Sequence, residues 1–402
     1  MNSRLASLQP YPFQRLAQLI QGIAPPAGKS VIRLSMGEPQ HDAPALVLEV
    51  LKTNLSGYSN YPVTMGATEL RQAIALWATR RFHLTKVTLQ PERNVLPVAG
   101  TREALFSIAQ AVIDRRVNSQ RPSVVMPNPF YQIYEGAALL AGARPFFINT
   151  MEQNGFRMDF SSVPEEIWQK TPLVYVCSPG NPTGAVLTHD DLAKLIGLAQ
   201  KYNFIIASDE CYSEIYFDEA KPPVGLLQVA NDLGIKDYRH CIVFHSLSKR
   251  SSLPGLRSGF VAGDGELMQQ YHQYRTYQGC ALPPPTQAAS QAAWSDETHV
   301  RANREQYRAK FEAVLEILKP VLDVNKPEAG FYLWPKLPQD DESFTHNLYA
   351  RENVLVLPGS YLSREFEGVN PGQNRARLAL VAPLPECIEA AQRIRNYVES
   401  IK

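Results

Sequence analysis

Three short segments carry side chains that could act together in catalysis. Asn181 lies in SPGNPTG, and Asp209 and Tyr212 lie three residues apart in SDECYSEI. Lys249 and Arg257 lie in SLSKRSSLPGLRSGF. The serines just before this lysine are Ser246 and Ser248. The set offers an amine, a carboxylate, a phenol, an amide and a guanidinium, and such groups can bind an aromatic aldehyde that carries a phosphate.

Pyridoxal phosphate is the cofactor whose chemistry needs this whole set. Its aldehyde forms a Schiff base with a lysine amine. Its ring nitrogen needs a carboxylate that keeps it protonated, because the protonated ring accepts electrons from the substrate. Amide and phenol groups are hydrogen-bond partners for the ring 3-oxygen. We therefore expect Lys249, Asp209, Asn181 and Tyr212 to surround the ring of this cofactor.

A phosphate site is predicted upstream, where LPVAGTREALFSIAQAVI is typical of a short strand, a glycine turn and a helix. Gly100 and Thr101 fall at the predicted helix start, where free N–H groups and the helix dipole favour an anion. An ordinary strand–turn–helix explains this segment equally well on its own. Hydroxyls and an arginine, which a phosphate also needs, lie around Lys249.

Each of these residues also has an ordinary structural explanation. A single lysine is usually a solvated charge, and an aspartate after a strand, such as Asp209, is more often a helix N-cap. Asn181 in GNPTG is typical of a turn. Tyr212 alone would be a core residue, and Arg257 alone a surface ion-pair partner. Their joint occurrence after successive predicted strands favours the shared site.

Four apolar runs predict the strands that position these residues. The runs VVM, LVYVC, FIIAS and CIVFH begin at residues 124, 173, 204 and 241 and lack alternation, which is typical of strands buried on both faces. The last three are about one βαβ unit apart. A helix is predicted after Thr188, its expected N-cap. We predict an α/β fold with a mostly parallel sheet, whose ligands bind beyond the carboxyl ends of the strands.

Three regions are predicted along the chain. Residues 44–292 form a large α/β domain that binds the cofactor. Residues 293–402 form a smaller α+β domain, because a long helical pattern from about 296 to 319 is followed by FYLWP, VLVLP and RARLALV. Residues 1–43 are rich in proline, have no core of their own and are expected to pack on the smaller domain.

Composition limits the class of protein. The 402 residues are 45% apolar and 20% charged with a net charge of +1, which indicates a globular chain without a broad field for nucleic acid or an anionic membrane. Five cysteines without a CxxC pair disfavour a metal site and suit a reducing compartment. No segment approaches about 18 consecutive apolar residues. We expect a cytoplasmic protein without nucleic-acid or membrane partners.

The motifs resemble, in their order, those of a known family. Besides the three segments above they are GEP at 37, YPVTMG at 61, AGT at 99, NPFYQIY at 128, AGFYLW at 329 and RARLALV at 375. Over nearly its whole length the chain is similar to the fold-type I pyridoxal-phosphate aminotransferases of class I/II, the aspartate aminotransferase superfamily. This resemblance implies a large domain with a mostly parallel seven-stranded sheet between helices, and a smaller α+β domain.

The resemblance also implies a role for each matching residue around the cofactor. Lys249 matches the Schiff-base lysine, and Asp209 matches the partner of the ring nitrogen. Asn181 and Tyr212 match the partners of the ring 3-oxygen. The residues that match the phosphate cup are Gly100, Thr101, Ser246, Ser248 and Arg257.

Two aromatic positions carry further implications. Tyr61 matches a tyrosine that reaches the phosphate of the neighbouring subunit, which implies a homodimer with shared active sites. Tyr131 matches the aromatic residue that stacks on the cofactor ring. Phe130 is the competing choice, because PNPFYQ departs from the usual Pro-Gly-Tyr-Pro form.

The substrate residues follow from the same resemblance. Arg377 matches the arginine that binds the substrate α-carboxylate bidentately. Arg375 should share its strand face, so the assignment depends on the family register. Gly37 matches a backbone contact near the substrate, and Asn181 is expected to contact the substrate as well as the cofactor.

The implied activity is a ping-pong transamination with Lys249 as the general base. The segments SMGEPQHDAPALVLEVL, NPFYQIYEGAALLAGA and RLALVAPLPECIEAA resemble N-succinyldiaminopimelate aminotransferases of bacterial lysine biosynthesis. The expected donor is therefore N-succinyl-LL-2,6-diaminopimelate, and the expected acceptor is 2-oxoglutarate. A second cation should bind the distal carboxylate, and the candidates are Arg33, Arg275 and Lys29.

Other functions stay open. A broad aspartate, alanine or aromatic aminotransferase is the nearest alternative, and a C–S lyase that uses the same cofactor for β-elimination is the next. Regulators of the family carry an N-terminal winged-helix domain, which about forty proline-rich residues cannot supply.

Overall fold

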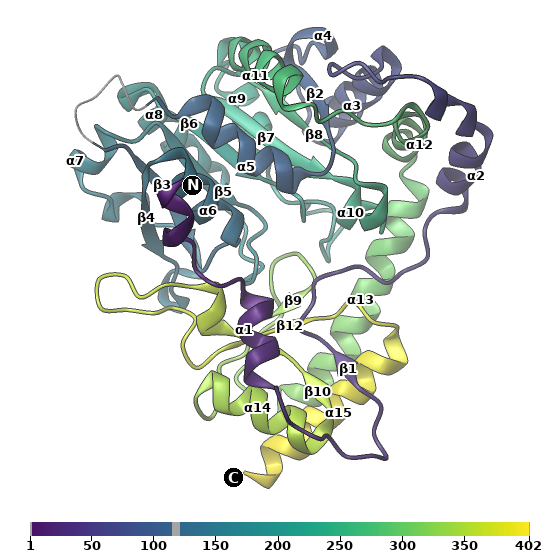
Figure 1. The fold of residues 1–402 in the computed structure, drawn as a ribbon, viewed down its shortest axis with the longest axis vertical. Coiled ribbons are helices and arrows are strands. Elements are labelled where there is room, and N and C mark those ends of the chain that lie inside the picture. Colours follow the sequence, from purple (N-terminus) through teal and green to yellow (C-terminus); the bar gives the residue numbers. More distant parts are fainter. Residues whose placement is uncertain (1, 115–120, 402) are drawn as a thin grey trace.

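A seven-stranded sheet lies at the centre of the upper part of the molecule in Figure 1. The computed structural model describes residues 2–114 and 121–401. The strand order is β2-β8-β7-β6-β5-β3-β4, and β8 runs antiparallel to both of its neighbours while the other pairs are parallel. The strands are β2 Val95–Val98, β3 Ser123–Asn128, β4 Arg144–Asn149, β5 Leu173–Cys177, β6 Ile205–Asp209, β7 Cys241–Ser246 and β8 Gly259–Gly263. The predicted α/β fold with a mostly parallel seven-stranded sheet is confirmed.

Helices cover both faces of this sheet. Within β5, Val174 and Val176 belong to the core shared with α3, α8 and α12, whereas Leu173 and Tyr175 belong to the core shared with α5, α6 and α11. Successive side chains of a strand point to opposite faces, so both faces of β5 are buried against helices. This explains why the central runs of the sequence are apolar without alternation.

Helix α8 begins at the N-cap that the sequence predicts. Thr188 caps α8 by accepting from the backbone N–H of Asp191, and the Asp191 side chain bonds back to the backbone N–H of Thr188, which confirms the predicted cap. The helices of the large core are α2 Ala45–Thr53, α3 Thr68–Arg81, α4 Pro91–Asn94, α5 Thr101–Val112, α6 Gln132–Ala141, α7 Glu165–Trp168, α8 His189–Tyr202, α9 Leu226–Asp232, α10 Leu247–Arg250, α11 Gly265–Gln278 and α12 Pro284–Ser295.

A second core lies in the lower part of Figure 1 and combines Ile32 and Leu34 with residues from the C-terminal part of the chain. A three-stranded antiparallel sheet has the order β11-β12-β9, and β1 pairs in parallel with β10. Its elements are α1 Pro12–Leu19, β1 Ile32–Arg33, α13 Thr298–Leu318, β9 Tyr332–Leu333, α14 Asp341–Glu352, β10 Val354–Leu355, β11 Leu357–Pro358, β12 Ala376–Ala379 and α15 Leu384–Ser400. The pairing of β1 with β10 attaches this part of the N-terminal segment to the second core. The 3-10 helix η1 Ser3–Ser7 lies against α6 of the large core instead, which corrects the expectation that all of residues 1–43 pack on the smaller domain.

One predicted boundary needs a correction. The division between residues 292 and 293 falls inside α12, whose Ala293 and Trp294 belong to the large core. The next helix, α13, contributes Tyr307 and Phe311 to the second core. We therefore place this boundary between α12 and α13, and we propose the other boundary, after residue 43, as predicted.

Within residues 2–114 and 121–401, no helix combines the length and the apolar character needed to cross a membrane. The same residues contain no cluster of three or more His, Cys, Asp or Glu side chains that could hold a metal ion.

Candidate active site

The polar residues that follow β5, β6 and β7 meet at one cavity. These strands are neighbours in the sheet, so their carboxyl ends lie side by side. A cavity of about 780 Å³ lies at these ends, and Asn181, Asp209 and Lys249 line it. The other predicted site residues in its lining are Gly37, Thr101, Tyr131, Tyr212, Ser246, Ser248, Arg257 and Arg377.

Lys249 lies in α10, the single turn that follows β7. Its Nζ donates to the backbone oxygen of Gly37 over 2.7 Å. Burial, helped by the positive charges of Arg377 and Arg257, lowers the pKa of Lys249 to about 8. The amine therefore loses its proton well below the pH at which an exposed lysine does. An uncharged amine is what both attack on an aldehyde and removal of a proton require.

Asp209 ends β6 as a buried carboxylate. Its Oδ2 accepts from the phenol of Tyr134 over 2.6 Å, and its Oδ1 accepts from the backbone N–H of Cys211 over 3.2 Å. Burial raises the pKa of Asp209, and the hydrogen bonds from Tyr134 and Cys211 act in the opposite direction. These two donors favour the charged form, which is the form that can hold a protonated ring nitrogen.

Tyr134 is a site residue that sequence reasoning missed. It lies in α6, buried, and its ring stacks on Tyr175 with centroids 4.7 Å apart. The Tyr175 hydroxyl instead donates to the backbone oxygen of Leu105 over 2.6 Å. Nothing in NPFYQIY shows that its last tyrosine reaches Asp209, because the two residues meet only through the stacking of α6 on the sheet.

Tyr212 is paired with a second phenol from the smaller region. The hydroxyls of Tyr212 and Tyr332 lie 2.9 Å apart, and both residues line the cavity. Tyr332 can therefore donate to Tyr212 while Tyr212 donates to a cofactor oxygen. A Cβ on Gly37 would collide with the Tyr332 hydroxyl, so this position requires glycine.

Arg377 and Asn181 face the same part of the cavity. Arg377 Nη1 donates to Asn181 Oδ1 over 3.1 Å, and its Nη2 donates to the backbone oxygen of Ser35 over 2.7 Å. Its buried Nε has no hydrogen-bond partner among the described residues. Arg377 lines the cavity, so its guanidinium can bind a substrate carboxylate there. Because Asn181 turns its oxygen toward Arg377, its amide nitrogen is left to donate to a ring oxygen.

Arg375 is not an alternative to Arg377. It lies just before β12 and forms an antiparallel bridge with Lys336 that continues the register of β12 with β9. Its guanidinium pairs with Glu152 over 2.6 Å and donates to the backbone oxygen of Trp334. It therefore stays outside the cavity lining.

The residues predicted to bind the phosphate lie around the start of α5. Gly100 has φ +85°, and a Cβ there would collide with the Arg257 guanidinium. Arg257 therefore packs against the backbone at the helix start, next to Thr101. Ser246 Oγ accepts from the backbone N–H of Ser248 over 3.1 Å and caps α10. A guanidinium, hydroxyls and two helix N-termini fit the phosphate of pyridoxal phosphate, with Asp209 and Lys249 placed for its ring.

Tyr131 and Phe130 occupy different environments. Tyr131 lines the cavity, and its hydroxyl accepts from Arg102 Nε over 2.7 Å. Phe130 is buried outside the lining and packs on Phe147 with ring centroids 5.1 Å apart. This placement favours Tyr131 as the residue that stacks on the cofactor, and that role stays a prediction.

Tyr61 is fully exposed in the single chain and lies outside the cavity lining. Its predicted contact would need a neighbouring subunit and stays a prediction.

The three candidates for the distal cation lie elsewhere, which is a correction. Arg275 is buried and pairs with Glu103 over 2.8 Å. Lys29 pairs with Glu352. Arg33 is an exposed residue of β1, and none of the three lines the cavity.

Arg102 is the cation that sequence reasoning missed at this point. It follows the predicted phosphate residues directly, lies in the first turn of α5 and lines the cavity. Its place next to the AGT motif was the available signal, because a residue in the first turn of that helix lies close to the predicted phosphate site.

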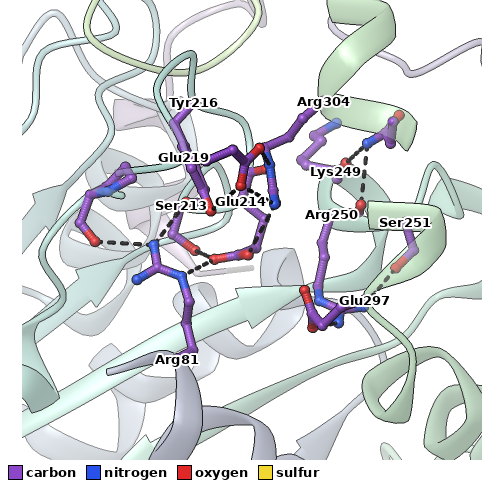
Figure 2. A network of polar contacts seen from close by, with 12 residues as sticks. Arg81, Ser213, Glu214, Tyr216, Glu219, Lys249, Arg250, Ser251, Glu297 and Arg304 are labelled. Atoms are coloured by element: carbon purple, nitrogen blue, oxygen red, sulfur yellow. Dashed lines mark hydrogen bonds and ion pairs between the residues drawn. The ribbon is translucent and has the colours of Figure 1, made fainter. Parts of the chain in front are cut away.

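A buried ionic network fixes the segment that follows Asp209 (Figure 2). Arg81 of α3 donates to the Glu214 carboxylate over 2.7 Å, and Arg304 of α13 donates to the backbone oxygen of Glu214 over 3.3 Å. Burial raises the pKa of Glu214, but the charges of Arg81, Arg250 and Arg304 outweigh it and hold the pKa below its usual value. The network thus joins the large core, the strand-end segment and the smaller region.

The fold and the cavity together define a pyridoxal-phosphate enzyme. The family model for aminotransferase class I and II matches residues 29–394, and the chain belongs to this family. It is therefore a pyridoxal-phosphate-dependent aminotransferase, and the predicted family and cofactor are confirmed. The roles of individual residues stay predictions.

Similar proteins cover almost the whole chain. An LL-diaminopimelate aminotransferase from Aquifex aeolicus is 33% identical in an alignment of 401 positions that covers 98% of each chain. The structure of an aminotransferase from Neisseria meningitidis is 48% identical with a TM-score of 0.94 and covers 99% of this chain and 100% of its own. The structure of a probable N-succinyldiaminopimelate aminotransferase from Thermus thermophilus is 26% identical with a TM-score of 0.83, over 96% of this chain and 99% of its own.

The burial of Lys249 predicts a pH dependence of cofactor capture. Only the uncharged amine attacks the aldehyde, so capture by cofactor-free protein should speed up about tenfold per pH unit below the pKa. The rate should level off above a pH of about 8. Stopped-flow absorbance measures it, with N-acetyl-lysine as the control for ionisation of the cofactor itself. A rate that climbs as far as that of the free amine, whose pKa is about 10.4, would contradict the effect of burial.

The Tyr134 contact predicts a selective loss of rate in Tyr134→Phe. Removing a hydrogen bond to a charged group costs about 1.5–3 kcal/mol, so kcat should fall about tenfold or more while the fold persists. Tyr175→Phe is the matched control, because it removes a phenol of the same stack that does not touch Asp209. Steady-state kinetics compares the two. Equal losses in both variants would show that the Asp209 contact has no special role.

Proposed function

We propose that the chain transfers the amino group of N-succinyl-LL-2,6-diaminopimelate to 2-oxoglutarate. The observation that carries this proposal is that two cationic side chains, Arg377 and Arg102, line the same cavity of about 780 Å³. Arg377 suits the α-carboxylate of either substrate. Arg102 suits a carboxylate at the far end of a long donor or of 2-oxoglutarate.

The similar proteins support the same class of donor. The relative from A. aeolicus is named for LL-diaminopimelate, and the probable enzyme from T. thermophilus is named for its N-succinyl derivative. The segment SMGEPQHDAPALVLEVL, which resembles the N-succinyl enzymes, supplies Gly37 and Glu38 to the cavity.

The chain's own residues divide the work. When bound, pyridoxal phosphate supplies an aldehyde for the donor's amino group and a ring that stores an electron pair. Arg377 orients the donor through its α-carboxylate, with Asn181 beside it. The uncharged Lys249 amine would be the base that removes the proton from the donor's α-carbon and, once protonated, the acid that returns it. Asp209 would pair with the ring nitrogen and favour its protonated form, and Tyr212 would donate to the ring 3-oxygen.

Free LL-diaminopimelate is the second candidate donor. The 33% identity to the enzyme from A. aeolicus favours it. Its distal ammonium would require a carboxylate in the cavity, and Glu38 lies in the lining. The N-succinyl donor carries no charge on that nitrogen and adds a carboxylate. The distal end of free LL-diaminopimelate therefore needs an anionic side chain for its ammonium, whereas the N-succinyl group needs a cationic one for its carboxylate.

A panel of single-turnover reactions tests the donor. Each donor is mixed with the cofactor-loaded enzyme without acceptor, and loss of the cofactor's visible absorbance gives kcat/KM for that half-reaction. We expect N-succinyl-LL-2,6-diaminopimelate to exceed aspartate, alanine and phenylalanine by about 100-fold, the value of two or three kcal/mol of distal contacts. Faster conversion of free LL-diaminopimelate, or of aspartate or alanine, would overturn the assignment. Pyruvate and ammonia released from a sulfur amino acid without an acceptor would reveal a C–S lyase.

Arg102 predicts a specific change in substrate preference. In Arg102→Gln, KM for 2-oxoglutarate should rise about 10–100-fold, because one charge-assisted contact to the distal carboxylate is lost. The half-reaction with alanine, which has no distal carboxylate, should change less than about threefold. In Arg102→Lys, which keeps the charge, KM for 2-oxoglutarate should lie between the values of the wild type and of Arg102→Gln. An equal effect on alanine and 2-oxoglutarate would place Arg102 outside the distal subsite.

We also propose a homodimer in which Tyr61 contacts the partner's phosphate site, in a cytoplasmic setting. The exposed Tyr61 side chain and the exposed apolar residues Leu55, Tyr58 and Val63 beside it support a buried partner surface. The cysteines of the described chain are all free, which suits a reducing compartment. Sedimentation at micromolar concentration tests the dimer, and a monomer with full activity would exclude shared sites.

A further inference from the structure

Three residues outside the cavity form a hydrogen-bonded chain that ends on the main chain of Lys249. Asn303 Nδ2 donates to the backbone oxygens of Lys249 and Arg250 over 3.1 and 3.2 Å. Asn303 Oδ1 lies 2.6 Å from His41 Nδ1, and His41 Nε2 lies 2.6 Å from Lys310 Nζ. Asn303 and Lys310 are seven residues apart, so they share one face of α13.

The partners fix the direction of every bond in this chain. Both oxygens that face Asn303 Nδ2 are acceptors, so the amide cannot be flipped, and its Oδ1 must accept from His41. His41 therefore carries its proton on Nδ1, and its Nε2 accepts from Lys310, which also donates to the backbone oxygen of Val381 over 3.2 Å. Burial lowers the pKa of His41, and the nearby Lys310 charge acts in the same direction, which agrees with a neutral imidazole.

The hydrogen-bonded chain supplies donors to backbone carbonyl groups at the end of a very short helix. The helix α10 has only the four residues Leu247–Arg250, so its last carbonyl groups need partners from outside. Asn303 supplies one to Lys249 and one to Arg250. On another side, the Arg250 guanidinium donates to the backbone oxygen of Ala293 over 2.7 Å and pairs with Glu297 (Figure 2).

The segment 37–41 holds Lys249 at both ends. The backbone oxygen of Gly37 accepts from the Lys249 amine, whereas His41 supports the Lys249 main chain through Asn303. The Ser252 hydroxyl donates to the backbone oxygen of His41 over 2.8 Å and ties the same segment to the loop after α10. The five residues 37–41 thus reach both the amine of Lys249 and, through Asn303, its main chain.

We propose that His41, Asn303 and Lys310 are positioning residues, which hold the Lys249 main chain where its amine reaches the aldehyde of pyridoxal phosphate. This inference rests on the proposed role of Lys249 as the residue that binds the cofactor. It does not depend on the identity of the amino donor. It also assigns a physical role to His41, which lies in the segment SMGEPQHDAPALVLEVL.

Cofactor capture by the full-length cofactor-free protein tests the proposal. The variants are Asn303→Leu and His41→Phe, which break the chain, and His41→Gln, whose amide can both donate to Asn303 and accept from Lys310. Stopped-flow absorbance gives the rate of covalent capture of pyridoxal phosphate. Quenching of tryptophan fluorescence gives the affinity for pyridoxamine phosphate, which has no aldehyde and reports the non-covalent site alone.

We expect capture to slow about tenfold or more in Asn303→Leu and His41→Phe, as misplacement of a reacting group by a fraction of an ångström does. The affinity for pyridoxamine phosphate should stay within about threefold, and His41→Gln should recover the rate to within about threefold. Asn231→Leu is the matched control, because Asn231 is equally buried and bonds the backbone N–H groups of Lys86 and Val87, away from the cavity.

Three results would overturn the proposal. These are unchanged capture in Asn303→Leu, an equal slowing in Asn231→Leu, and a parallel loss of capture and of pyridoxamine phosphate affinity. Borohydride reduction and peptide mapping of the wild type accompany the rates. Capture at another lysine would overturn the role of Lys249 and the positioning with it, whereas capture at Lys249 with unchanged rates would overturn the positioning alone.

Discussion

A lysine that acts as a nucleophile and a base must lose its proton near neutral pH. Water opposes this loss because it stabilises the charged ammonium form. In this chain the Lys249 amine is withdrawn from water at the carboxyl end of β7, and two guanidinium groups lie close enough to disfavour its charge. The neighbouring strands β5 and β6 bring the amide of Asn181 and the carboxylate of Asp209 to the same edge. The parallel order of the sheet is therefore what turns residues dispersed along the sequence into one site.

The charges of the cavity make sense as a set. Lys249, Arg257, Arg377 and Arg102 are cationic groups that line the same space, and in the chain alone they repel one another. A phosphate and the carboxylates of substrate and acceptor offset this repulsion. Each anion that binds also favours the protonated amine, so anion binding and the basicity of Lys249 are coupled. Asp209 stands apart as a buried carboxylate whose own donors, Tyr134 and Cys211, keep it ready for a single cation.

The sequence predicted the parts of the site that depend on local patterns and on strand order. Asn181, Asp209 and Lys249 each follow an apolar run, so their meeting could be expected once the runs were taken as neighbouring parallel strands. Tyr134 could not be found in this way, because its contact with Asp209 depends on how α6 stacks on the sheet.

Arg275 was a candidate for the distal cation because it is an arginine, yet it is buried in the core and pairs with Glu103. Arg375 was placed beside Arg377 by alternation, but its guanidinium pairs with Glu152 and stays outside the cavity lining. Charge and spacing thus identify candidates, and packing decides among them.

The central claim is that the amine of Lys249 makes the covalent link to pyridoxal phosphate. Reduction of the cofactor-loaded protein with borohydride makes that link permanent, and peptide mass spectrometry then locates it. The account predicts one labelled peptide, which contains SLSK with the cofactor mass on Lys249. A label on a different lysine, such as the buried Lys310, or no label on a protein that still binds the cofactor, would contradict it.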